Sequence, residues 1–200
     1  GIDKITINDI HQAADMGFRI KLLGVSQITN SGLEQKMSPC LVPATSPLGQ
    51  LEGGTNMIVI EGDQVGQIVL RGAGAGEGPT ASAVISDVMD LARGISVATF
   101  GQPAKTLIKT SSSKSQTPAP YYLRMLLHDE PGALAKITKI LSQFNVSIDR
   151  MRQYGHEDEN APVLIVTHEI SHEDLMTAIK ELPHTKVLKA QPLAIRIEAV

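Results

Sequence analysis

The sequence lacks several features that mark particular classes of protein. It contains no Trp, its aromatic content is 3%, and its formal net charge is -3. Without a basic excess or aromatic stacking surfaces, no nucleic-acid partner is expected. The single cysteine, Cys40, excludes an internal disulfide and fits a reducing compartment. No apolar run could span a bilayer and no signal peptide is visible, so we expect a cytoplasmic protein without a membrane partner.

The residues that are present form a two-part chain. Residues 101–120 are rich in Ser, Thr, Pro and Lys and poor in large apolar side chains, which predicts a linker. It separates a first part, residues 1–100, from a compact second part, residues 121–200. The chain opens on Gly1 rather than Met and enters patterned sequence at once, so we expect it to belong to a longer protein.

The first part predicts a helix-flanked mixed β-sheet. A short helix is expected with Asn8 as its N-cap and Gly17 just past its end. Two strands, residues 18–29 and 33–45, follow, and then a β-hairpin that turns at residues 61–63. A final helix is expected from Pro79 to Arg93, since proline suits the first helical turn; Ala81, Val84, Ile85, Val88, Met89 and Leu91 lie on its apolar face.

The second part predicts two helices and four strands in the order β-α-β-β-α-β. The segments expected to form them are residues 121–128, 131–144, 146–154, 163–170, a helix capped by Ser171, and 185–199. The third segment alternates apolar and polar residues with a slip near Arg150, which indicates a β-bulge. This order is the ferredoxin-like split βαβ arrangement, so the whole chain is assigned to the α+β class.

A glycine-rich loop lies between the hairpin and the helix of the first part. The stretch "RGAGAGEGPTASAV" has Gly72, Gly74, Gly76 and Gly78 at alternate positions. It does not fit the dinucleotide fingerprint G-x-G-x-x-G, and no acidic residue ends a strand about 20 residues further on. Two interpretations stay open. The loop is a tight strand-to-helix connection, or it makes a secondary contact to a nucleotide bound mainly by another part of the protein.

The stretch "HEISH" matches the zinc motif H-E-x-x-H. Zinc binding by this motif requires both histidines on one helical face. Here His168 ends a predicted strand and Ser171 is a predicted N-cap, so His168 and His172 should point in different directions. No metal site is therefore predicted, and zinc peptidase activity is only a remote alternative.

The stretch "HDEPGALAKI" joins the first strand of the second part to its first helix. Asp129 is expected to cap the helix, Pro131 suits its first turn, and Gly132 leaves the backbone open. Free N–H groups at such a turn would hold a small carboxylate, and Asp129 could pair with an ammonium group. These residues fit an α-amino acid lying across the turn; a simple capped helix start fits them equally well.

Longer stretches resemble known families. "DEPGALAKITKILSQFNVSIDRM" resembles an ACT domain, the βαββαβ module that binds amino acids in regulated biosynthetic enzymes. "IKLLGVSQ", "GTNMIVIEGD" and "GAGAGEGPTASAVISDVMDLA" resemble the C-terminal half of the catalytic portion of homoserine dehydrogenase. The resemblance covers nearly the whole chain.

The resemblance implies a function for the parent enzyme and roles for particular residues. The family reduces aspartate semialdehyde to homoserine with NAD(P)H, on the route to threonine, methionine and isoleucine. Its nucleotide-binding domain, catalytic lysine and substrate-holding acidic residues precede this segment, so no catalytic residue is assigned and the fragment is expected to be inactive, with no cofactor held stably. Gly76 is implied to touch the cofactor of the full-length enzyme, and the strands to form a dimerising sheet.

The ACT resemblance implies an amino-acid effector, with threonine as the first candidate. The residues implied to bind it are Asp129, Gly132, Ala133, Leu134, Ser147 and Ile148. The site commonly forms between two modules, which implies a homo-oligomer. Serine-binding relatives have a polar residue two places before Asp129, where this chain has Leu127, so the resemblance leaves the effector's identity open. The alternative is a stand-alone amino-acid-binding regulatory protein.

Overall fold

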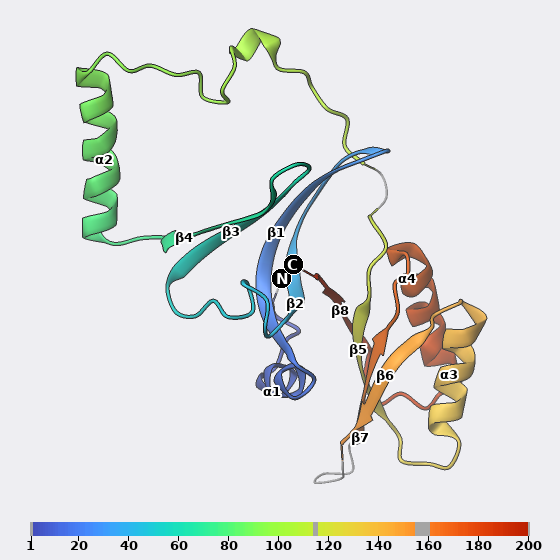
Figure 1. Ribbon diagram of the computed structural model, residues 1–200. Helices are drawn as coiled ribbons and strands as arrows, with labels where there is room; N and C mark the ends of the chain where they lie inside the picture. The colour runs from blue at the N-terminus through green and yellow to red at the C-terminus, as the bar shows by residue number, and fades with distance from the viewer. Residues whose placement is uncertain (1, 114–115, 155–160, 200) are drawn as a thin grey trace. The chain divides into compact units, whose positions relative to one another are not determined.

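A computed structural model of the chain describes residues 2–113, 116–154 and 161–199 (Figure 1). It contains two compact units, one formed by residues 1–49 with 112–200 and the other by residues 50–111. These spatial units do not follow the predicted division at residues 101–120, because residues 1–49 share a sheet with the second part of the chain.

The ferredoxin-like arrangement predicted for the second part is confirmed. Its elements are β5 (Tyr121–Leu127), α3 (Ala133–Gln143), β6 (Ile148–Gln153), β7 (Ala161–Thr167), α4 (His172–Glu181) and β8 (Leu193–Ile197). The strands lie in the order β8-β5-β7-β6, and each neighbouring pair is antiparallel. The register of β6 shifts between Ile148 and Arg150, as the slip in its alternation predicted. Ser171 is the N-cap of α4 and accepts a hydrogen bond from the Asp174 backbone N–H.

Alternate residues of β5 enter two different cores. Leu123 and Met125 pack with α3 and α4, which lie on one face of the sheet (Figure 1). Tyr122, the residue before Leu123, packs on the opposite face with Ala13 and Leu41 from the first segment of the chain. Because successive side chains of a strand point to opposite faces, this central strand is apolar at every position except Arg124.

The first segment extends the sheet. It consists of α1 (Ile7–Asp15), β1 (Phe18–Thr29) and β2 (Gly32–Pro43), and the two strands form a long antiparallel hairpin. β2 pairs in parallel with β8 through Cys40 with Arg196 and Leu41 with Ile197, giving a six-stranded mixed sheet in the order β1-β2-β8-β5-β7-β6. The predicted α+β class is therefore confirmed.

The start of α1 differs from the prediction. Its N-cap is Thr6, and Asn8 lies inside the helix. Thr6 and Asp9 form a reciprocal capping box, in which Asp9 accepts from the Thr6 backbone N–H at 2.8 Å and Thr6 accepts from the Asp9 backbone N–H at 3.3 Å. Asp9 is fully buried and also lies 3.0 Å from Nε of Arg124 on β5. One carboxylate thus caps α1 and joins it to β5.

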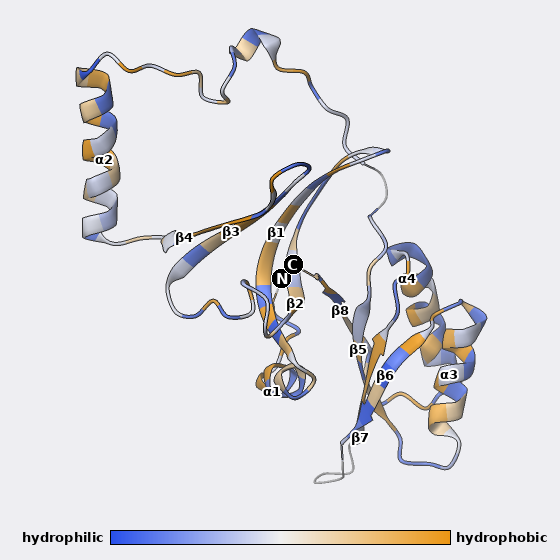
Figure 2. Cartoon of the chain, in the orientation of Figure 1, coloured by the Kyte–Doolittle hydropathy of each residue, from blue (hydrophilic) through white to orange (hydrophobic). Residues whose placement is uncertain are grey.

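The second unit consists of a hairpin and a helix. β3 (Thr55–Gly62) pairs antiparallel with β4 (Gly66–Ala73), and α2 spans Glu77–Ala92, two residues earlier than Pro79. None of residues 50–111 is buried. Figure 2 shows apolar residues along α2, and three of them, Val84, Ile85 and Val88, are each more than half exposed. The unit has secondary structure but no core of its own.

Candidate functional site

A pocket of about 360 Å³ lies where β5 joins α3. The loop that forms it is held by backbone hydrogen bonds: the His128 N–H donates to Val187 at 2.8 Å, and the Ala133 N–H donates to the Glu130 carbonyl at 3.1 Å. Gly132 adopts a left-handed conformation, with φ of 85°. An L-residue is disfavoured there, so the glycine fixes the sharp entry into the helix.

The capping role predicted for Asp129 is wrong. The N-cap of α3 is Gly132, which makes no side-chain hydrogen bond, and the helix begins two residues after Pro131. The first intrahelical bond runs from the Lys136 N–H to the Gly132 carbonyl. The N–H groups of Leu134 and Ala135 precede that bond, and within the described ranges no acceptor is assigned to them. They provide donors at the positive end of the helix dipole.

The structure brings four of the six predicted effector residues together. Asp129, Gly132, Ala133 and Leu134 all line this pocket. Carboxylate oxygens of Asp129 therefore share a pocket with the backbone donors of a helix start. This pairing offers one partner for an ammonium group and another for a carboxylate.

Ser147 and Ile148 do not line the pocket. Ser147 accepts a hydrogen bond from the His168 N–H at 2.9 Å, and Ile148 packs against the helix-covered core. The reason is strand direction. β5 and β6 both run antiparallel to β7, so they are parallel to each other, and the end of β6 lies at the edge where the β5 loop begins.

Gln153 occupies that end of β6 and lines the pocket, and the sequence analysis missed it. The signal that would have found it is the topology itself. In a βαββαβ module the first and second strands are parallel, so the last residue of the second strand lies beside the first loop. Its amide adds both a donor and an acceptor to the pocket.

The glycine loop joins β4 to α2 over residues 74–76. Gly76 is the N-cap of α2, with φ of 123°, and it makes no side-chain cap. A Cβ at Gly74 would collide with the Asn56 side-chain amide. Both features fit the tight strand-to-helix connection, and the second interpretation, a nucleotide contact, depends on Gly76 and the first turn of the helix.

Of the two histidines of "HEISH", only His172 lies on a helix. β7 ends at Thr167, before His168, and α4 begins at His172. Nδ1 of His172 lies 3.2 Å from the Tyr121 hydroxyl oxygen. Across residues 2–113, 116–154 and 161–199, no three His, Cys, Asp or Glu side chains cluster as metal ligands would. In the same ranges, no helix has the length and apolar content needed to cross a membrane.

The fold and the loop pocket define a class of protein, namely a regulatory ACT module joined to a segment that lacks a complete core. Comparison with known proteins agrees. The family model for the ACT domain matches residues 121–184, and the model for homoserine dehydrogenase matches residues 1–89.

The chain is similar over its whole length to homoserine dehydrogenases, and its second part matches the ACT domain. It is 36% identical to the homoserine dehydrogenase of Neisseria gonorrhoeae over 100% of this chain and 48% of the relative. It is 35% identical to that of Helicobacter pylori over 99% of this chain and 47% of the relative. A crystal structure of the Thiobacillus denitrificans enzyme superposes with a TM-score of 0.86 and 32% identity, over 100% of this chain and 47% of that one. The chain thus spans about half the length of its relatives.

Proposed function

We propose that this chain is the effector-sensing part of a homoserine dehydrogenase, joined to the C-terminal half of its catalytic portion. The whole enzyme would interconvert aspartate semialdehyde and homoserine with NAD(P) in the cytoplasm. Relatives named homoserine dehydrogenase that align with the entire chain support this. We expect the chain alone to be inactive, since the resemblance places the principal cofactor site and the catalytic lysine outside it.

The residues of the glycine loop fit one contact to a dinucleotide. Gly76 has no side chain to obstruct an approaching phosphate, and the Glu77 and Gly78 N–H groups lie in the first turn of α2. The Glu77 carboxylate, in the same turn, opposes a phosphate, so the loop suits a single backbone contact better than a complete site. NAD(P)H supplies the hydride when bound; the loop would only help to position the cofactor.

The observation that carries the sensing role is the pocket at the start of α3. Asp129, the N–H groups of the first helical turn and the Gln153 amide line one cavity of about 360 Å³. An α-amino acid would place its ammonium group at Asp129 and its carboxylate at the helix start. We propose threonine as the effector. Ser147 and Ile148 would belong to the site only through the β6 strand of a second copy.

A homo-oligomer fits the exposed edges and faces of the first unit. β1 and β6 are the two edge strands of its sheet, and β6 is exposed along most of its length. An edge strand with free backbone groups is a ready surface for pairing with another sheet. Leu22, Ile28 and Met37 on the β1–β2 hairpin are each at least 60% exposed. We propose that the hairpin sheet and the ACT modules both form contacts between copies.

Calorimetric titration of threonine into the 200-residue chain tests the sensing role. We expect saturable heat, and an affinity on the order of tenfold weaker in Asp129→Ala, because a charge-assisted hydrogen bond contributes about 1.5 kcal/mol. Asp63→Ala, in the exposed hairpin turn, is the matched control and should bind as the wild type does. No heat with threonine, isoleucine or methionine would contradict the sensing role.

An enzyme assay tests the proposal that the chain alone is inactive. NADPH oxidation with aspartate semialdehyde should stay at background for this chain. Turnover above background would show that the residues needed for catalysis lie within it.

A further inference from the structure

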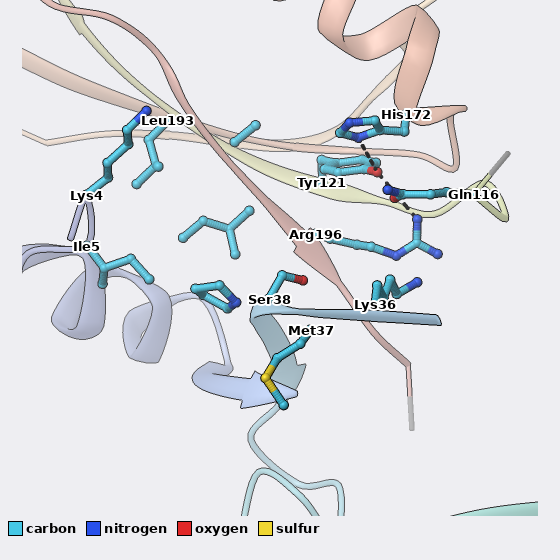
Figure 3. Close-up of a pocket in the computed structure, with 13 residues that line it drawn as sticks. Lys4, Ile5, Lys36, Met37, Ser38, Gln116, Tyr121, His172, Leu193 and Arg196 are labelled. Atoms are coloured by element: carbon cyan, nitrogen blue, oxygen red, sulfur yellow. Dashed lines mark hydrogen bonds between the residues drawn. The ribbon is translucent and has the colours of Figure 1, made fainter. Parts of the chain in front are cut away.

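A second pocket of about 350 Å³ lies where the first segment meets the ACT module, within one compact unit (Figure 3). Residues 36–39 of β2 form one side and residues 193–196 of β8 form another. These strands pair through only two residue pairs. The pocket shares no lining residue with the pocket at the start of α3, and the proposed function assigns it no role.

The charge of this pocket has one sign. Lys4, Lys36 and Arg196 line it, and among the described residues that do so there is no Asp or Glu. Glu34 and Glu198, which are not lining residues, pair with Lys36 at 3.0 and 2.9 Å. Three lysine or arginine charges against two carboxylates leave an excess of one positive charge, that of Lys4, because Lys36 and Arg196 pair with Glu34 and Glu198. A ligand with one negative charge would balance it.

One end of the pocket holds fixed hydrogen-bonding groups. Arg196 has a side chain only 8% exposed, held by Glu198 at 2.7 Å and by the Thr117 carbonyl at 2.7 Å. The Tyr121 hydroxyl links Arg196 to His172, at 3.4 and 3.2 Å, as the dashed lines in Figure 3 show. Hydrogen bonds are assigned to Nε and Nη1 of Arg196 and none to Nη2 within the described ranges. A guanidinium held in this way is preorganised for a carboxylate.

The rest of the wall is apolar. Ile5, Leu193 and Ile195 line it, and Leu193 and Ile5 lie toward the end opposite His172 in Figure 3. A ligand therefore needs a small hydrocarbon body beside its charged group. An ammonium group would find no carboxylate among the lining residues.

We propose that this junction pocket binds a small organic monocarboxylate without an ammonium group. Its carboxylate lies between Arg196, Lys36 and His172, and its carbon body lies against Ile5 and Leu193. Because the ligand contacts both β2 and β8, its binding stabilises the short pairing that joins the first segment to the ACT module. His172 is a ligand-binding residue in this pocket.

The test is a titration of the 200-residue chain, followed by backbone amide NMR, with butyrate, butanamide and L-2-aminobutyrate. These probes share a four-carbon skeleton and differ in charge. Butyrate should give saturable shifts at His172 and Arg196, and butanamide should bind at least about tenfold more weakly, because it cannot form the charge-assisted bonds. L-2-aminobutyrate should shift the α3 loop instead, so failure of the sensing site would leave the butyrate result intact.

Variants locate the binding. Arg196→Gln should abolish butyrate binding. His172→Gln, on an exposed residue at the start of α4, should weaken it several-fold and keeps the test decisive if Arg196→Gln does not fold. His184→Gln, 74% exposed and outside the pocket, should have no effect. No saturable butyrate shift at these residues, equal binding of butanamide, or full binding by His172→Gln would overturn the proposal.

Discussion

The two compact units are both rich in apolar residues, yet only one has a core. In residues 1–49 and 112–200, the ACT sheet is covered by α3 and α4 on one face and by the first segment on the other. In residues 50–111 no side chain is buried. The contrast teaches that an amphipathic pattern indicates an apolar helix face. It does not indicate whether a nearby segment of the chain covers that face.

Helices α3 and α2 show the difference most directly. On α3, Ile137 and Leu141 are fully buried, whereas on α2 the residues Val84 and Val88 are 54% and 53% exposed. Exposed apolar surface of this extent marks an interaction face.

The largest expected effect is a difference in stability loss between two leucine-to-alanine substitutions, one in each unit. Leu123→Ala, at a side chain with no exposure, should lower the free energy of unfolding by about 3 kcal/mol because it leaves a cavity. Leu91→Ala, at a side chain 73% exposed, should change it by less than about 0.5 kcal/mol. Urea denaturation of both variants measures this. Equal losses would mean that α2 has a packed core in solution.

A smaller loss is expected where the first segment is tied to the ACT sheet. Asp9→Ala removes the capping box of α1 and leaves Arg124 without its partner. Arg124 is 21% exposed and can be partly hydrated, so we expect a loss of about 2 kcal/mol, less than the cost of breaking a fully buried pair. Asp3→Ala, on an exposed residue, is the control in the same thermal or urea melt. An unchanged midpoint for Asp9→Ala would refute this structural role.

The glycine at the start of α3 should have a moderate effect. Gly132→Ala forces an L-residue to a φ of 85°, which costs about 1 kcal/mol of stability. Gly132→Asn should cost less, because asparagine tolerates the left-handed region. Gly54→Ala, where no neighbouring atom obstructs a Cβ, serves as the control. If the alanine and asparagine variants melt alike and at the wild-type midpoint, the left-handed turn is not present in solution.

The smallest effect is a pH dependence at Glu34. Burial raises the pKa of this carboxyl, but hydrogen bonds from the Thr117 backbone, the Thr117 hydroxyl and Lys36 outweigh burial, so the pKa is lowered from 4.5. A lowered folded pKa gives stability that is present above the unfolded value and is lost as pH falls through the folded value. The stability difference between wild type and Glu34→Gln should therefore be constant above about pH 5.5 and shrink on acidification below 4.5.

Denaturant unfolding at several pH values measures this difference. Glu169→Gln, on an exposed residue outside the network, is the control. A difference that grows as the pH falls would have the wrong sign and would contradict the assignment.

Local patterns predicted most of the ACT module and less of everything else. The β-bulge at Arg150 and the N-cap Ser171 depend on a few neighbouring residues, and both were found from the sequence. The pairing of β2 with β8 joins residues more than 150 positions apart through two residue pairs, and no local signal encodes it. The prediction that Asn8 caps α1 is wrong because Thr6 and Asp9 form the reciprocal capping bonds.

The candidate site was predicted in part for the same reason. Four of its residues are consecutive or nearly so around the α3 start, so a single motif contains them. Gln153 is brought to them only by the parallel direction of β5 and β6. The junction pocket has no motif at all, because its charged residues come from β2, β8 and a segment before α1.

Amide hydrogen exchange of the 200-residue chain, read residue by residue, tests the comparison between the two units most directly. We expect slow exchange for β5 and β7, which unfold only with the whole sheet. We expect fast exchange throughout α2, which has no buried side chain. Protection of α2 equal to that of β5 would contradict it, because residues 50–111 would then have a core within this chain.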